Sequence, residues 1–229
     1  MAIVKKYPAE IVDIQHPIDD VYTFELKSLG KPFKYESGQF LHLAIEEYDP
    51  STQWPDSRCF SIQSAPNESN IKITFAAKGE FTRKMVQELK IGSQLTLKLP
   101  YGNLFSQQHN KENTVFISGG TGITPYLSLF NNTLFGTYFK PILFAGFRNE
   151  EMNIYKFELE AAKKINDGFD VRFTYQDREG MLNIEKIYLQ SDKESSFFIS
   201  GPPEMIKNFK TFLLNQKVSE NRILTDDWE

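Results

Sequence analysis

The chain has 229 residues and a formal net charge of −4, and 40% of its residues are hydrophobic. This composition supports a sizeable packed core and excludes a disordered chain, a fibre and a disulfide-stapled miniprotein. A single cysteine, Cys59, excludes an internal disulfide and a four-cysteine iron–sulfur cluster within these residues. We therefore expect a reducing, cytoplasmic compartment, with no membrane span, no secretory signal, no metal site and no nucleic-acid partner.

The first half of the chain has the pattern of short strands separated by turn residues. In Val21–Leu26, for example, every second residue is apolar. Strands at this spacing predict a small antiparallel barrel. One helix, Phe81–Leu89, is predicted after Gly79. The six predicted strands are Glu10–Ile14, Val21–Leu26, Gln39–Ile45, Arg58–Ser64, Asn70–Ala77 and Gln94–Leu99.

The second half alternates strands with helices, which predicts a five-stranded parallel sheet covered by helices on both faces. The polar segment Gln107–Asn113 is the best linker candidate, so we expect one domain over residues 1–105 and another over 106–229. The predicted strands are Thr114–Ile117, Pro141–Phe147, Asp170–Tyr175, Ser196–Ile199 and Arg222–Thr225. The predicted helices are Pro125–Leu134, Ile154–Ile165, Ile184–Leu189 and Pro203–Leu214.

A glycine-rich segment, Gly119-Gly-Thr-Gly-Ile-Thr-Pro125, joins a predicted strand to a predicted helix. Glycines let backbone amides approach a phosphate, and the helix N-terminus adds a partial positive charge. The third glycine of the usual dinucleotide-binding pattern is replaced by Pro125, so the loop is not of the standard kind. On these residues alone, a tight turn without a ligand remains open.

The strand Arg58-Cys-Phe-Ser-Ile-Gln-Ser64 carries a second candidate site. Arg58, Phe60 and Ile62 would point to one side of the strand and the residues between them to the other. An arginine can neutralise a phosphate, an aromatic ring can stack on a flat ligand, and a serine hydroxyl can hydrogen-bond a ring nitrogen. An ordinary barrel strand with an exposed arginine is an equally good interpretation of these residues alone.

Two further segments lie where ligands are commonly bound. In Lys78-Gly-Glu-Phe-Thr82 we predict Thr82 as the N-cap of a helix, whose open amides would suit a second phosphate. Simple capping remains the alternative. Ser200-Gly-Pro-Pro-Glu-Met205 follows an apolar strand, at the sheet edge where ligands of parallel sheets gather.

In this order along the chain, the four segments resemble the signatures of the ferredoxin–NADP reductase family of flavoenzymes. Arg58–Ser64 is similar to Arg-x-Tyr-Ser-x-x-Ser with phenylalanine in place of tyrosine, and Gly79 and Thr82 match Gly-x-x-Ser/Thr. Gly119–Pro125 matches Gly-Gly-x-Gly-x-Thr-Pro in full, and Ser200–Met205 is similar to Cys-Gly-Pro-x-x-Met with serine in place of cysteine.

The resemblance implies an N-terminal FAD-binding barrel and a C-terminal NAD(P)-binding α/β domain. It implies a flavin ring against Arg58–Ser61, its pyrophosphate at Gly79–Thr82, and a nicotinamide whose C4 lies near the flavin N5. The implied catalytic residues are Ser61, Thr124, Ser200 and Trp228. The implied cofactor-binding residues are Arg58, Cys59, Phe60, Ser61, Phe75, Ala77, Gly79, Phe81, Thr82, Gly120, Thr121, Gly122, Thr124, Pro125, Arg148, Arg178, Gly201, Pro202 and Met205.

The function implied by the resemblance is an FAD-dependent NAD(P)H oxidoreductase that passes electrons to a separate carrier such as ferredoxin or flavodoxin. A flavin reductase that releases reduced free flavin is the alternative among enzymes, and a non-catalytic nucleotide-binding subunit is an alternative of another class. NADPH and NADH remain equally open, because Arg148 and Arg178 favour a 2′-phosphate whereas Asp177 and Glu179 repel it.

The acidic C-terminus ends in Trp228 followed by one glutamate. Because a tryptophan gains by being covered, and because family members often end in an aromatic residue beside the flavin, we expect Trp228 to pack near the flavin ring with Asp226 nearby. A frayed, exposed tail is the alternative.

Overall fold

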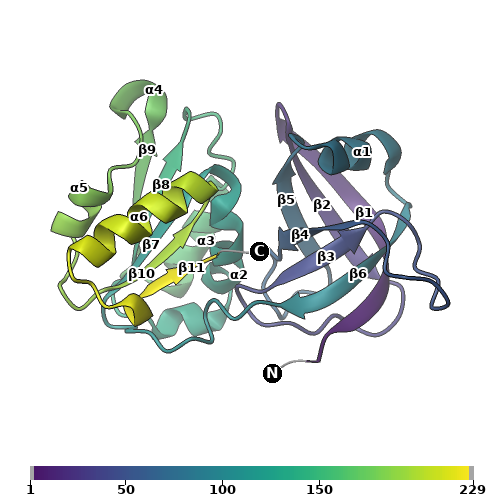
Figure 1. Cartoon of the computed structure of the whole chain (residues 1–229), viewed down its shortest axis with the longest axis horizontal. Coiled ribbons are helices and arrows are strands. Elements are labelled where there is room, and N and C mark those ends of the chain that lie inside the picture. Colours follow the sequence, from purple (N-terminus) through teal and green to yellow (C-terminus); the bar gives the residue numbers. More distant parts are fainter. Residues whose placement is uncertain (1–2, 227–229) are drawn as a thin grey trace. The chain divides into compact units, whose positions relative to one another are not determined.

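The computed structural model describes residues 3–226, and Figure 1 shows their helices and strands. The chain divides into two compact units between Asn103 and Leu104. The polar segment expected to be a linker, Gln107–Asn113, therefore lies inside the second unit. It is held there because the Asn110 amide donates to Ser196 Oγ over 2.9 Å and His109 contacts the Tyr138 hydroxyl over 2.7 Å.

The first unit is a six-stranded antiparallel sheet, which confirms the predicted fold class. The sheet order is β4-β3-β6-β1-β2-β5, and the two edge strands meet because the amide of Gln63, just after β4, donates to the carbonyl of Lys72 in β5 over 2.8 Å. This bond closes the sheet into the predicted barrel. The strands are β1 (Lys5–Ile18), β2 (Val21–Ser28), β3 (Phe40–Ala44), β4 (Ser57–Ser61), β5 (Ile71–Ala76) and β6 (Gln94–Tyr101).

Alternating apolar residues fill this barrel. In β2, Phe24 and Leu26 are buried, whereas Glu25 between them is half-buried. Helix α1 (Glu80–Glu88) has apolar residues four positions apart, and these two, Phe81 and Met85, join the barrel core. The core therefore fixes the position of the first turn of α1.

The second unit is a five-stranded parallel sheet in the order β11-β10-β7-β8-β9, again as predicted. Its strands are β7 (Thr114–Gly119), β8 (Ile142–Phe147), β9 (Asp170–Tyr175), β10 (Ser196–Ser200) and β11 (Ile223–Thr225). Its α-helices are α2 (Thr124–Phe130), α3 (Lys156–Ile165), α4 (Gln176–Glu179), α5 (Ile184–Leu189) and α6 (Pro203–Asn215). Three short 3₁₀ helices are η1 (Gly120–Ile123), η2 (Thr133–Thr137) and η3 (Glu220–Arg222).

Side chains that alternate along the central strands of this sheet build two separate cores. In β7, Phe116 packs with residues of α2 and α3, whereas Val115 and Ile117 pack with residues of α5 and α6. Helices thus cover both faces of the sheet, and Figure 1 shows α6 lying across one of them. This explains why the strands read as continuous apolar runs.

Several local features differ from the prediction. Strand β1 spans Lys5–Ile18, well beyond the predicted Glu10–Ile14. The helix expected at Pro125–Leu134 ends at Phe130, because the side chain of Asn132 accepts a hydrogen bond from the Leu134 amide and caps the separate 3₁₀ helix η2. The four-residue helix α4 was not predicted. Within residues 3–226, no helix combines the length and apolar character needed to cross a membrane.

Candidate functional site

In the first unit, Arg58 lies beside the first turn of α1. Its guanidinium carbon is 5.1 Å from the centre of the Phe81 ring, and its side chain is 54% exposed. Asp56 Oδ1 accepts a hydrogen bond from Arg58 Nη1 over 2.6 Å. The expected phosphate-binding arginine and the expected phosphate-binding helix start are therefore neighbours.

The first turn of α1 is arranged differently from the prediction. The N-cap is Gly79, not Thr82, which stands three residues further on. The Thr82 hydroxyl reaches back, accepting from the Gly79 amide over 3.1 Å and making a second 3.1 Å contact with the Gly79 carbonyl. The predicted cap was therefore wrong: a threonine at the N-cap would accept from amides inside the first turn, whereas Thr82, at the third helical position, accepts from the amide of the N-cap residue Gly79.

The remaining residues of the β4 motif divide between two sides. Phe60 packs in the barrel core, where its ring meets Phe75 edge-on at 5.5 Å, and it is 6% exposed. Cys59 faces the other side, with its sulfur 3.5 Å from Nε2 of His42 on β3. Partial burial raises the pKa of the Cys59 thiol and lowers the pKa of His42, which favours a neutral pair. Ser61 ends the strand and is buried.

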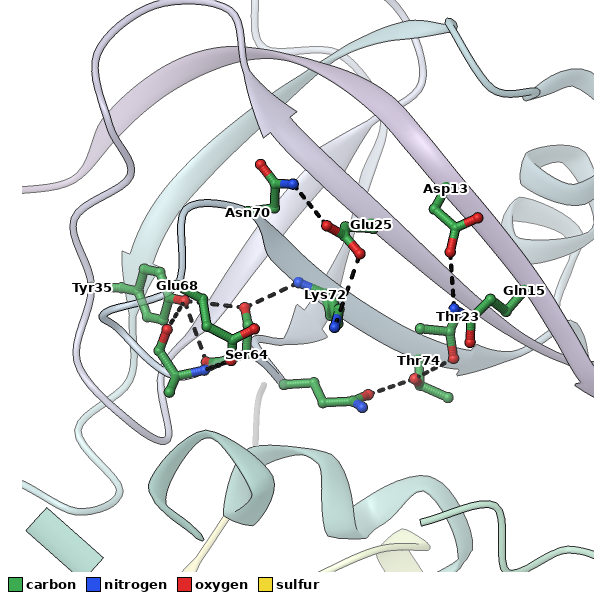
Figure 2. Close-up of polar contacts among 12 residues, drawn as sticks. Asp13, Gln15, Thr23, Glu25, Tyr35, Ser64, Glu68, Asn70, Lys72 and Thr74 are labelled. Atoms are coloured by element: carbon green, nitrogen blue, oxygen red, sulfur yellow. Dashed lines mark hydrogen bonds and ion pairs between the residues drawn. The ribbon is translucent and has the colours of Figure 1, made fainter. Parts of the chain in front are cut away.

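A buried tyrosine that the sequence reasoning missed holds the end of the motif (Figure 2). The Tyr35 hydroxyl contacts the Ser64 carbonyl, the Ser64 hydroxyl and the Ala65 carbonyl, the last over 2.9 Å. The Ser64 hydroxyl accepts from the Lys72 amide of β5 over 3.0 Å, and the Ala65 amide donates to Glu68 over 2.7 Å. Tyr35 lies in a loop, with no periodic pattern to indicate its burial.

A second buried chain of polar groups runs from the same segment into the sheet. The Thr74 hydroxyl donates to the Gln63 side-chain carbonyl and lies 2.7 Å from the Thr23 hydroxyl, as Figure 2 shows for the two threonines. Because buried polar groups are costly when unpaired, these bonds fix the conformation that follows β4.

In the second unit, the two glycine-containing segments predicted at one sheet edge meet backbone to backbone. A Cβ atom built on Gly122 would lie 2.5 Å from the Cα atom of Gly201. A Cβ atom on Gly119 would lie 2.9 Å from Pro202 and 3.1 Å from the sulfur of Met205. These contacts require glycine, and they bring the start of η1 and the start of α6 to one edge.

Gly120 gives this edge an open backbone. Its φ is +57°, which disfavours side chains, and a Cβ atom built there would meet nothing within 4 Å. This open space beside the half-buried Gly120 backbone suits the close approach of a phosphate. The neighbouring Thr124 is buried, and its hydroxyl donates to the Thr121 carbonyl over 2.9 Å.

Ser200 and Asp226 meet at the same edge. The Ser200 hydroxyl donates to Asp226 Oδ2 over 3.2 Å, and the Asp226 amide donates to the Ile199 carbonyl over 3.1 Å. Asp226 therefore extends β11 beside the end of β10; its expected place near the flavin ring stays a prediction. Trp228 lies outside the described residues.

Arg148 and Arg178 follow the ends of β8 and β9. Both are exposed, and Arg178 forms an ion pair with Glu150 over 3.2 Å. No cluster of three histidine, cysteine or acidic side chains that could hold a metal ion occurs within residues 3–226.

These arrangements fit the two expected groups. A diphosphate requires cationic and amide donors, which Arg58 and the first turn of α1 supply together. A second phosphate requires backbone that a ligand can approach closely, and the position where a Gly120 Cβ atom would lie is open.

Comparison with known proteins supports the two expected cofactors. A family model described as an FAD-binding domain matches residues 4–125, and one described as an oxidoreductase NAD-binding domain matches residues 116–211. A ferredoxin NADP⁺ reductase from Neisseria gonorrhoeae with bound FAD and NADP has the same fold, with a TM-score of 0.81 and 19% identity over 97% of this chain and 98% of that one. The chain belongs to the ferredoxin–NADP reductase family. It is an oxidoreductase that binds FAD and a nicotinamide coenzyme.

Curated relatives include a flavohemoprotein of Rhizobium meliloti (strain 1021), 25% identical over 93% of this chain. Another is the reductase component of phenol 2-monooxygenase from Pseudomonas sp. (strain CF600), 25% identical over 86% of this chain. The chain covers 58% and 59% of these two relatives.

Proposed function

We propose that the protein is an NAD(P)H-dependent flavoprotein reductase whose electrons pass to an acceptor outside these 229 residues, either a ferredoxin-like or a flavodoxin-like carrier. The observation that carries the proposal is the backbone contact of Gly122 with Gly201, which assembles a nucleotide-binding edge in a chain whose other unit fits FAD. The phenol 2-monooxygenase relative is named as a reductase component, which supports transfer to a separate protein.

Each set of residues has a task in this proposal. Arg58 and the first-turn amides of α1 hold the FAD diphosphate, while the bonds of Tyr35 and Ser64 keep the end of the motif in place. The edge at Gly119–Pro125 and Ser200–Met205 holds the coenzyme. Asp226 orients the Ser200 side chain by accepting a hydrogen bond from its hydroxyl. Bound FAD supplies the redox chemistry, because a flavin accepts a hydride and releases electrons singly or in pairs.

In this proposal, the protein accelerates the reaction mainly by positioning. Two reactants held in a fixed geometry react faster than two in solution, without a side-chain acid or base. The buried Ser61 and Ser200 hydroxyls serve to orient the two cofactors.

A panel of acceptors tests the proposal. The FAD-loaded protein, reduced without oxygen by NADH or NADPH, is mixed with a ferredoxin, a flavodoxin or free FMN. Rapid oxidation of the protein by a carrier, with FAD still bound after desalting, supports the proposal. Loss of FAD on desalting together with turnover that follows added free flavin would show the releasing type of flavin reductase instead.

A further inference from the structure

The loops that follow β8 and β9 are joined at the carboxyl edge of the second unit. The amide of Asp177, in α4, donates to the carbonyl of Arg148 over 3.0 Å. The loop after β8 is itself folded, because the Met152 amide donates to the Asn149 side chain over 3.0 Å and the Asn153 amide donates to the Glu150 carbonyl over 3.1 Å. Side chains on the two loops are thereby held opposite one another.

Glu150 uses this arrangement to bind two cations at once. Its Oε1 lies 3.1 Å from Lys156 Nζ, and its Oε2 lies 3.2 Å from Arg178 Nη2. The hydrogen bonds and charges of Lys156 and Arg178 lower the pKa of the Glu150 carboxyl, so it is ionised at neutral pH. The guanidinium of Arg178 also lies 5.5 Å from the centre of the Tyr175 ring.

This ion-pair network engages Lys156 and Arg178, and Arg178 is one of the two arginines that would favour a 2′-phosphate; Arg148 is not part of the network. NADPH differs from NADH by that phosphate on the adenosine ribose, whereas NADH has a hydroxyl there. A carboxylate repels the phosphate and accepts a hydrogen bond from the hydroxyl. Asp177 and Glu179, on either side of Arg178 in the sequence, add further negative charge. A phosphate at this edge would compete with Glu150 for the Arg178 guanidinium.

We propose that Glu150 determines the choice of coenzyme in this protein, and that it makes the protein prefer NADH to NADPH. The inference rests on the proposed function, since it assigns the ribose of the coenzyme to the edge formed by the ends of β8 and β9. Glu150 acts in two ways: it neutralises the charges of Arg178 and Lys156, and it accepts a hydrogen bond from the 2′-hydroxyl of the ribose.

Binding of coenzyme fragments tests this role without turnover. Calorimetry on the FAD-loaded protein at low salt compares 5′-AMP with 2′,5′-ADP, which adds the distinguishing phosphate. We expect wild-type protein to bind 2′,5′-ADP no more tightly than 5′-AMP. Glu150→Gln is expected to bind 2′,5′-ADP about tenfold more tightly than wild type, because it releases Arg178 and removes one negative charge. Its affinity for 5′-AMP is expected to change less than twofold.

Glu151→Gln is the matched control, since it removes the same charge from the adjacent position, which is also exposed. We expect it to leave the ratio of the two affinities unchanged. Adding Arg178→Ala to Glu150→Gln is expected to abolish the gain in 2′,5′-ADP affinity. Arg178→Ala alone is expected to change the wild-type affinity for 2′,5′-ADP less than twofold. Both glutamates are exposed, so neither substitution removes a buried contact.

The outcomes separate this inference from the proposed function. If 5′-AMP binds and Glu150→Gln leaves the ratio as in wild type, or Glu151→Gln shifts it equally, Glu150 has no specific role and the inference is wrong. If wild type binds 2′,5′-ADP more tightly than 5′-AMP, the inference is also wrong. If neither fragment binds, the coenzyme site itself is wrong, and the proposed function fails with it.

Discussion

The Arg58 guanidinium lies 5.1 Å from the centre of the Phe81 ring, which joins the end of the Arg58–Ser64 motif to the first turn of α1. Two segments more than twenty residues apart in the sequence thus present a cation and a set of helix amides together. Neither group alone would distinguish a phosphate site from an ordinary surface. Their proximity supports the FAD diphosphate assignment.

Replacing Arg58 by alanine should weaken FAD binding. Charge-assisted hydrogen bonds contribute about 1.5–3 kcal/mol, and the half-exposed position of Arg58 places the loss toward the lower figure, about tenfold in affinity. The measurement is FAD titration of the apoprotein, followed by protein fluorescence.

Arg172→Ala is the matched control for this prediction. Arg172 also pairs with an aspartate two residues earlier, and its guanidinium lies 5.4 Å from the ring centre of Phe144, but it is in the second unit. We expect the Arg172→Ala variant to bind FAD with the same affinity as the wild-type protein. Equal losses in the two variants, or none in Arg58→Ala, would refute the assignment of the diphosphate to Arg58.

Gly122→Ala should disrupt the coenzyme edge. Its new methyl group would lie 2.5 Å from the Gly201 Cα atom, so the two backbone segments would have to separate. We expect a loss of about 2 kcal/mol or more of unfolding free energy and at least a tenfold loss of NADH affinity, while FAD binding persists. Gly30→Ala is the control, because its Cβ atom meets nothing within 4 Å. Denaturant unfolding and NADH titration distinguish the two, and wild-type NADH affinity in Gly122→Ala would argue against this edge as the coenzyme site.

Tyr35→Phe should reduce stability and change its dependence on pH. Burial raises the pKa of Tyr35 to about 12, above its ordinary value of 10.0. Because the unfolded chain loses this proton first, the stabilisation is complete below pH 10 and is lost as the pH rises from about 10 to 12, with a slope of at most about 1.4 kcal/mol per pH unit.

Subtraction isolates this contribution from that of the other buried tyrosines, whose pKa values are also raised. The unfolding free energy of wild type should exceed that of Tyr35→Phe by about 1 kcal/mol at pH 8 and by less at pH 11. A difference that stays constant between these pH values would show that the Tyr35 hydroxyl is not protected as the structure indicates.

Ser200→Ala should affect the coenzyme and not the fold. The hydroxyl of Ser200 donates to Asp226 at the sheet edge, so its removal takes this hydrogen bond from the carboxylate beside the nicotinamide position that we propose. We expect kcat/KM for NADH to fall about tenfold with the melting temperature nearly unchanged. Ser191→Ala, which removes a partly buried hydroxyl bonded to the Ile187 carbonyl, should keep wild-type kinetics. Equal effects of both substitutions would mean that Ser200 has no special position.

The regular part of the fold could be predicted because its patterns are local. Turn residues, together with alternation in strands such as Val21–Leu26, identified the six strands of the barrel, and the alternation of strands with helices identified the five strands of the parallel sheet. The edge shared by Gly122 and Gly201 was also predictable, since both follow parallel strands, but the closeness of their backbones was not. Helix α4 could not be predicted, because four residues are too few to show a helical periodicity.

The side-chain networks depend on contacts between distant segments. Tyr35 meets Ser64 across 29 residues, and Glu150 meets Arg178 across 28, with no spacing rule to relate them. Phe60 is a further example. From the sequence we expected its ring to stack on a flat ligand, whereas in the structure the ring packs against Phe75 in the barrel core.

Reduction of the bound FAD by the coenzyme is the most direct test of the central claim. The claim is that this protein promotes hydride transfer from a nicotinamide coenzyme to FAD. The FAD-loaded protein is titrated with NADH, and separately with NADPH, in the absence of oxygen, while the visible flavin absorbance is recorded. We predict that the yellow colour bleaches with about one equivalent of NADH per FAD, and that it returns when oxygen is admitted. Bound FAD that keeps its full absorbance with an excess of either coenzyme would contradict the claim.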